Sequence, residues 1–92
     1  MSTGAARIRI LVIDDHPVVR EGIAALVTMQ PDMTVVGEAA DGREAIQQFR
    51  THRPDVAVMD LQMPEMNGLD ALIAIRNEFP DAKVIKIGRA HV

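Results

Sequence analysis

The sequence predicts an α/β fold in which parallel strands alternate with helices that cover both faces of one sheet. A strand-like segment followed by a helix-like segment recurs about three and a half times, with strand starts roughly 25 residues apart, as in successive βα units. The first strand-like segment closes in a continuous apolar run, which is typical of a strand covered on both faces. With 92 residues, 48% of them hydrophobic, the chain fits one domain.

The first unit pairs a strand over residues 7–13 with a helix that begins at Pro17. Proline suits the first turn of a helix. Apolar residues then recur at spacings of three and four until Pro31, which predicts one buried helix face. The residues of that face are Val19, Ile23, Leu26 and Val27.

The second unit begins with a short strand over residues 33–37. Asp41 and Glu44 have the spacing of a capping box, with Asp41 as the N-cap of the following helix. Arg53-Pro54 ends that helix, because the residue before a proline disfavours the helical region. The buried stripe of the helix comprises Ala45, Ile46 and Phe49.

The third unit places a strand over residues 55–59, directly before Asp60. A loop with a proline and an Asn-Gly pair follows, and helical spacing resumes from Leu69 to about Phe79. Residues 81–85 begin a fourth strand. Because a fifth unit is missing, we expect strand four to be an edge strand and part of the sheet to lack a covering helix.

Composition excludes several classes of function. Ten Lys and Arg against thirteen Asp and Glu give a net charge of -3, which disfavours direct nucleic-acid binding. The absence of Cys excludes disulfides and thiolate metal sites, and two Phe as the sole aromatics disfavour base-stacking surfaces. No apolar stretch is long enough for a membrane span and no secretory segment is evident, so we expect a cytoplasmic protein.

Acidic residues follow two of the predicted strands directly. Ligands of open parallel sheets bind outside the carboxyl ends of the strands, so Asp14, Asp15 and Asp60 converge if strands one and three are neighbours. Clustered carboxylates repel one another and require a cation, and oxygen ligands favour a hard ion such as Mg²⁺. A carboxylate beside Mg²⁺ can attack phosphorus, and Asp60 is the candidate nucleophile.

Three motifs resemble the receiver domain of bacterial two-component response regulators. They are residues 10–22, which contain Asp14-Asp15-His16-Pro17, residues 38–42, and residues 55–69, which contain Asp60-Leu61-Gln62-Met63-Pro64. The first motif is most similar to the subfamily whose receivers precede a LuxR-type helix-turn-helix. The resemblance covers residues 7–85.

This resemblance implies a flavodoxin-like fold with strand order 2-1-3-4-5, the order also found in a chemotaxis receiver. It implies that Asp60 accepts a phosphoryl group from a sensor histidine kinase. Asp15 and Asp60 would ligate Mg²⁺ directly, Asp14 would act chiefly through a bound water, and Gln62 would offer its backbone carbonyl. DNA would be bound only through an output domain absent from this chain, and a homodimer is a further expected partner.

The C-terminal segment departs from the family pattern. Family receivers carry a Ser or Thr at the end of strand four and a Lys at the end of strand five, whereas Gly88 occupies the first position and strand five is missing. We therefore expect residues 1–85 to be a partial receiver and residues 86–92 to be a non-native tail. Residues 87–92 resemble one translated frame of a sequencing-library adapter.

Two alternative functions stay open. A phosphatase of the haloacid-dehalogenase type also uses an Asp nucleophile, but it needs a second Asp two residues later, where Gln62 stands. We therefore expect no enzyme. The second alternative is an interaction module that works without phosphorylation. His16 is interpreted as a loop residue rather than a phosphate carrier, and the methionines near Asp60 as packing residues rather than soft-metal ligands.

Overall fold

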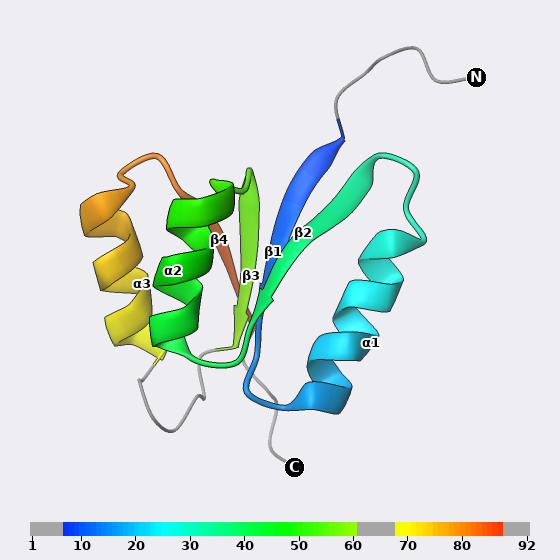
Figure 1. Cartoon of the computed structure of the whole chain (residues 1–92), viewed down its shortest axis with the longest axis horizontal. Helices are drawn as coiled ribbons and strands as arrows, with labels where there is room; N and C mark the ends of the chain where they lie inside the picture. The colour runs from blue at the N-terminus through cyan, green and yellow to red at the C-terminus, as the bar shows by residue number, and fades with distance from the viewer. Residues whose placement is uncertain (1–6, 61–67, 88–92) are drawn as a thin grey trace.

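The structure is a computed structural model that describes residues 7–60 and 68–87 (Figure 1). Strands and helices alternate along this part of the chain, which confirms the α/β class. The elements are β1 (Ile8–Ile13), α1 (Pro17–Thr28), β2 (Met33–Ala39), α2 (Gly42–His52), β3 (Val56–Asp60), α3 (Gly68–Glu78) and β4 (Lys83–Ile87). None of the described helices is long and apolar enough to cross a membrane.

The described strands form one parallel sheet in the order β2-β1-β3-β4. β1 and β3 are therefore neighbours, and the order agrees with the one that the resemblance implied. The pairing of β1 with β2 shifts by one residue between Ile10 and Leu11, so Val36 is passed over in the register. Because all the strands run in the same direction, their carboxyl ends lie along one edge of the sheet.

α2 and α3 cover one face of the sheet, and α1 covers the other (Figure 1). The main core lies between the sheet and the α2–α3 pair, where the rings of Phe49 and Phe79 are 5.2 Å apart. Its buried residues are Leu11, Ile13, Ala39, Ala45, Phe49, Ala57, Met59, Ala71, Leu72 and Ile75. Burial of this apolar surface holds the two helices on the sheet.

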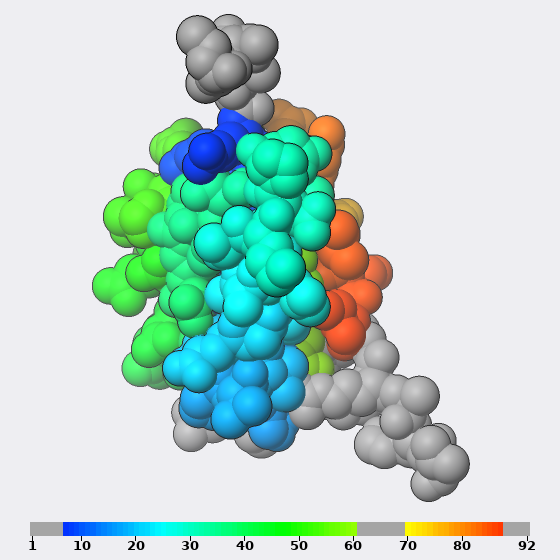
Figure 2. All heavy atoms as spheres, turned by 90° about the vertical axis from the view of Figure 1, so that its right-hand side faces the viewer, coloured from blue at the N-terminus to red at the C-terminus, as the bar shows by residue number. Residues whose placement is uncertain are grey.

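The α1 face is less completely covered. Ile10 and Val12 of β1 are buried, but α1 itself contributes no fully buried residue, and Leu26 is 65% exposed. Val19 is exposed as well, so the prediction that Val19 and Leu26 belong to the buried face of this helix is wrong. α1 packs against β1 and β2, and β4 stays visible beside α1 (Figure 2). In β4, Ile85 is 57% exposed. Within the described residues β4 is an edge strand, as expected, whereas Ile10 and Val12 of β1 are buried and not laid bare.

Three strands run further than the sequence predicts. β2 continues to Ala39, β3 includes Asp60, and β4 extends to Ile87, because parallel pairing persists along each strand. Asp60 pairs with Ile87 in the β3–β4 register. The interpretation of residues 86–92 as a non-native tail stays a prediction, although the first two of these residues extend β4.

The helix α2 begins with the predicted capping arrangement. The Glu44 backbone N–H donates to Asp41 Oδ1 at 2.8 Å, and Glu44 Oε1 accepts from the Ala40 backbone N–H at 2.8 Å. A standard capping box would return this second bond to the N-cap residue itself, one position later. The helix ends at His52 because Arg53 adopts a left-handed conformation with φ of 44°.

α2 and α3 are joined on their outer surface by a bidentate ion pair. Arg50 Nε donates to one Glu78 carboxylate oxygen at 2.6 Å and Arg50 Nη2 donates to the other at 2.7 Å. These hydrogen bonds lower the pKa of Glu78 below its ordinary value and raise the pKa of Arg50. Both groups are exposed, so the pair contributes modestly and is screened by salt.

We expect this contribution to disappear in acid. Because the pKa of Glu78 is lower in the folded chain than in the unfolded chain, the stabilisation is present above the ordinary glutamate pKa of about 4.3 and is lost as the pH falls through the lower value. Glu78→Gln should lower the melting temperature at neutral pH and have a smaller effect at an acidic pH below the ordinary glutamate pKa. Glu21→Gln on α1 is the control, and an equal effect of Glu78→Gln at both pH values would contradict the assignment.

Candidate functional site

Two aspartates end the central strands of the sheet. Ile13 pairs with Met59 in the β1–β3 register, so the next residues, Asp14 and Asp60, emerge side by side. Asp14 is 2% exposed and Asp60 is 1% exposed, and burial this complete is rare for carboxylates. The structure therefore brings these two predicted residues together at the carboxyl edge.

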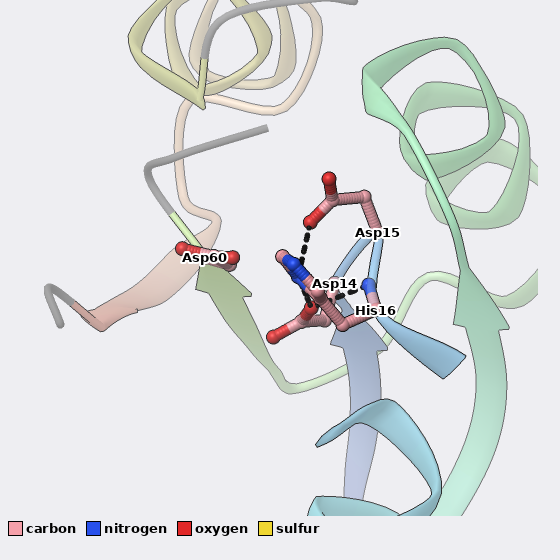
Figure 3. A group of neighbouring side chains, drawn as sticks. All are labelled: Asp14, Asp15, His16 and Asp60. Carbon is pink, nitrogen blue, oxygen red and sulfur yellow. Dashed lines mark hydrogen bonds and ion pairs between the residues drawn. The ribbon is translucent and has the colours of Figure 1, made fainter. Parts of the chain in front are cut away.

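Asp15 and His16 complete a cluster with the two buried aspartates (Figure 3). One oxygen from each carboxylate and one imidazole nitrogen all lie within 4.8 Å of one another. His16 Nδ1 is 2.8 Å from Asp15 Oδ1 and 3.3 Å from Asp14 Oδ1. His16, which the sequence places in the loop after the first strand, thus lies against the carboxylates, because the turn after β1 directs its ring back over them.

The cluster has the chemistry of a cation site. Three carboxylates place up to three negative charges in a small volume, and such charges repel one another unless a cation is present. Asp15 Oδ1 is shielded from solvent and accepts no hydrogen bond within the described part of the chain. It lies 2.8 Å from His16 Nδ1, as an ion pair if the imidazole is protonated. Carboxylate oxygens are the preferred ligands of Mg²⁺. The residues present therefore fit a divalent cation.

The backbone around Asp14 is held from three sides. The Asp14 N–H donates to the Ala39 carbonyl at 3.0 Å, and the His16 N–H donates to Asp14 Oδ1 at 2.8 Å. Arg20 Nη1 donates to the Asp14 carbonyl at 2.8 Å, while its Nε donates to Glu38 Oε1 at 3.2 Å. These bonds link the first turn of α1 to the ends of β1 and β2 and fix the direction of the Asp14 side chain.

The roles of Arg20 and Glu38 were not predicted from the sequence. A signal was available, because Glu38 lies at the carboxyl end of β2 and therefore at the same edge as Asp14 and Asp60. An arginine one helical turn after Pro17 is placed to reach a carboxylate at that edge.

We expect Arg20→Gln to weaken cation binding without abolishing it. Loss of the bond to the Asp14 carbonyl removes about 1 kcal/mol of support for the turn, so the Mg²⁺ affinity should fall by about five-fold. Titration calorimetry of the variant against Mg²⁺ measures this change. Arg43→Gln, in the exposed first turn of α2, is the matched control, and equal affinities for Arg20→Gln and the unaltered chain would show that Arg20 does not position the site.

Two positions named in the sequence analysis, Gln62 and Gly88, lie outside the described residues. The backbone carbonyl proposed for Gln62 and the missing hydroxyl at Gly88 therefore stay predictions.

Comparison with known proteins decides the family. The response regulator receiver domain family matches residues 10–91. The chain belongs to this family. Its described sheet and helices have the flavodoxin-like receiver fold, as in a solved LuxR-family two-component response regulator from Aurantimonas, which superimposes with a TM-score of 0.87 at 38% identity. That match covers 94% of this receiver and 61% of the solved chain.

Relatives of this receiver domain include proteins with different outputs. The nitrate/nitrite response regulator NarL of Escherichia coli is 43% identical over 76 residues, which are 83% of this chain and 35% of NarL. A protein-glutamate methylesterase/protein-glutamine glutaminase of Nitrosospira multiformis is 46% identical over 81 residues, which are 88% of this chain and 23% of that protein. The receiver thus spans about a quarter to a third of the length of these relatives.

Proposed function

We propose that this receiver is a phosphoacceptor module of a two-component phosphorelay, with Asp60 as the residue that accepts the phosphoryl group. The observation that carries the proposal is the buried carboxylate of Asp60 at the end of β3, beside Asp14, Asp15 and His16. Membership of the receiver family supports the same role.

The proposed reaction is a phosphoryl transfer to a carboxylate. An oxygen of Asp60 attacks the phosphorus of a phosphohistidine on a sensor kinase, a new P–O bond forms, and the P–N bond breaks with the electron pair leaving on the imidazole nitrogen. Asp14, Asp15, Asp60 and the backbone carbonyl of Gln62 would hold Mg²⁺, with Asp14 acting chiefly through a bound water. When bound, this ion neutralises charge on the phosphoryl oxygens.

The partners and location follow from this role. We propose a sensor histidine kinase as the phosphoryl donor, a second copy of the receiver as a further partner, and DNA contact only through a LuxR-type output domain of the whole protein. The LuxR-family title of a solved neighbour and the similarity to NarL support that output. We further propose a cytoplasmic location, a partial receiver over residues 1–85, a non-native tail over 86–92, and no enzymatic turnover by the receiver itself.

The test is phosphorylation of the intact parent receiver domain by acetyl phosphate with a radioactive phosphorus label. We expect label on the protein with Mg²⁺ and none when a chelator removes the ion, because the carboxylate cluster needs a cation to admit another anion. The acyl phosphate should be released by hydroxylamine. Steady turnover of a small phosphate ester would instead indicate a phosphatase, and the absence of label with an intact fold would favour a phosphorylation-independent interaction module.

A further inference from the structure

A pocket of about 350 Å³ lies at the amino edge of the sheet, opposite to the edge that carries the aspartate cluster. It is formed where α2 and α3 end and the chain leads into β3 and β4, at the top of the view in Figure 1. Phe49, Arg53, Glu78, Phe79 and Asp81 are among its lining residues, and we call it the amino-edge pocket. Its volume lies at the lower end of the range for small-molecule sites.

The charges around the amino-edge pocket favour a positively charged ligand. α2 and α3 both end there, and the carboxyl end of a helix carries a partial negative charge. The Asp81 carboxylate also lines the pocket, and it forms no ion pair with the other described residues. Glu78 is already paired with Arg50, so Asp81 is the carboxylate that stays available to a ligand.

The chain itself already places one cation in this pocket. The guanidinium carbon of Arg53 lies 5.7 Å from the centroid of the Phe79 ring, within the range of cation–π contacts. In the part of the chain that the structure describes, this guanidinium forms no hydrogen bond or ion pair, so the ring face is what it contacts. Because an exposed contact of this kind is weak, a second cation can displace the Arg53 side chain from the ring.

The Phe79 ring is a firm support for such a ligand. It packs against the buried ring of Phe49, with centroids 5.2 Å apart and planes inclined by 36°, and it lies against the main core. Its position is therefore fixed by the packing of α2 on α3, whereas Arg53 is held by a side chain with several rotatable bonds.

We infer that the amino-edge pocket binds a small, flat organic cation on the face of Phe79, with its positive charge balanced by Asp81. Arg53 occupies the same ring face when no ligand is bound, so it competes with the ligand. The site is separate from the aspartate cluster and does not depend on the proposed phosphoacceptor role.

A different use of Arg53 makes the opposite prediction. If the pocket instead took an anion, the guanidinium of Arg53 would be its main partner, and removal of that charge would abolish binding. If the pocket takes a cation, removal of the Arg53 charge raises the affinity, because a competitor for the ring is lost. The sign of the change at Arg53 therefore distinguishes the two kinds of ligand.

The experiment titrates the intact parent receiver domain with benzylguanidinium and, separately, with phenylacetate, an anion of similar size. Two-dimensional ¹H–¹⁵N NMR follows the backbone amides. We expect benzylguanidinium to shift the amide signals of Arg53, Phe79 and Asp81 in a saturable manner and phenylacetate to leave them in place. Arg53→Gln should bind benzylguanidinium about two- to five-fold more tightly, which is the effect of removing one exposed cation–π competitor.

A second variant tests the carboxylate. Asp81→Asn should bind benzylguanidinium about two- to five-fold more weakly, as for the loss of an exposed ion pair. Asp32→Asn, which changes another exposed aspartate at the amino edge, is the matched control and should bind as the unaltered domain does. Saturable binding of phenylacetate that is lost in Arg53→Gln, or no shift by benzylguanidinium in either the unaltered domain or Arg53→Gln, would overturn the inference.

Discussion

Asp60→Asn is expected to abolish labelling by acetyl phosphate in the presence of Mg²⁺. The substitution keeps the size and shape of the side chain in a site where Asp60 is 1% exposed, so the packing at the end of β3 should survive. It removes the anionic oxygen that would attack phosphorus, and an amide oxygen is a far weaker nucleophile. The measurement is the radioactive label retained on the protein after gel filtration.

The matched control is Asp81→Asn, which changes an exposed aspartate that precedes β4 at the opposite edge of the sheet. This variant should be labelled as fully as the unaltered chain. Undiminished labelling of Asp60→Asn, with an unaltered far-ultraviolet circular dichroism spectrum, would show that another residue accepts the phosphoryl group.

The position of the site follows from the sequence because strand direction decides it. Asp14 and Asp60 each end an apolar run, and in a parallel sheet the ends of neighbouring strands share one edge. The neighbour relation of β1 and β3 is the one assumption that the sequence could not supply, since strand order depends on which crossovers pack on which face. The family resemblance supplied it, and the observed order agrees.

The side-chain arrangement within the site was not predictable in the same way. The contact of His16 with Asp14 and Asp15 depends on the turn after β1 and on a side-chain torsion that spacing does not specify. The Arg20–Glu38 pair depends on how α1 lies across β1 and β2. These contacts belong to tertiary packing, which a local sequence pattern does not encode.

The same limit explains the error at Leu26. Helical periodicity identifies the apolar face of α1. How many residues of that face are buried depends on how much of it contacts the sheet. α1 contacts β1 and β2 at one side of the sheet, so Leu26 lies beyond the contact and is 65% exposed. The apolar stripe of α2 was predicted correctly because α2 packs on the sheet and also on α3.

Asp15→Ala is expected to abolish measurable Mg²⁺ binding in titration calorimetry. Asp15 is the carboxylate of the cluster that retains access to solvent, with 22% of its side chain exposed, so it is placed to meet an incoming ion. Its removal takes away one of three anionic groups and one direct ligand, and Mg²⁺ in proteins is held by only one or two carboxylates. The loss should therefore exceed the five-fold effect expected for Arg20→Gln.

Gln62→Ala is the informative comparison for this variant. If Gln62 contributes only its backbone carbonyl, alanine supplies the same oxygen and the Mg²⁺ affinity should change little. If the amide side chain were the ligand, its removal would weaken binding to a degree comparable with Asp15→Ala. A ranking in which Gln62→Ala loses more affinity than Asp15→Ala would contradict the coordination proposed for this receiver, because it would place the side-chain amide, and not the Asp15 carboxylate, against the ion.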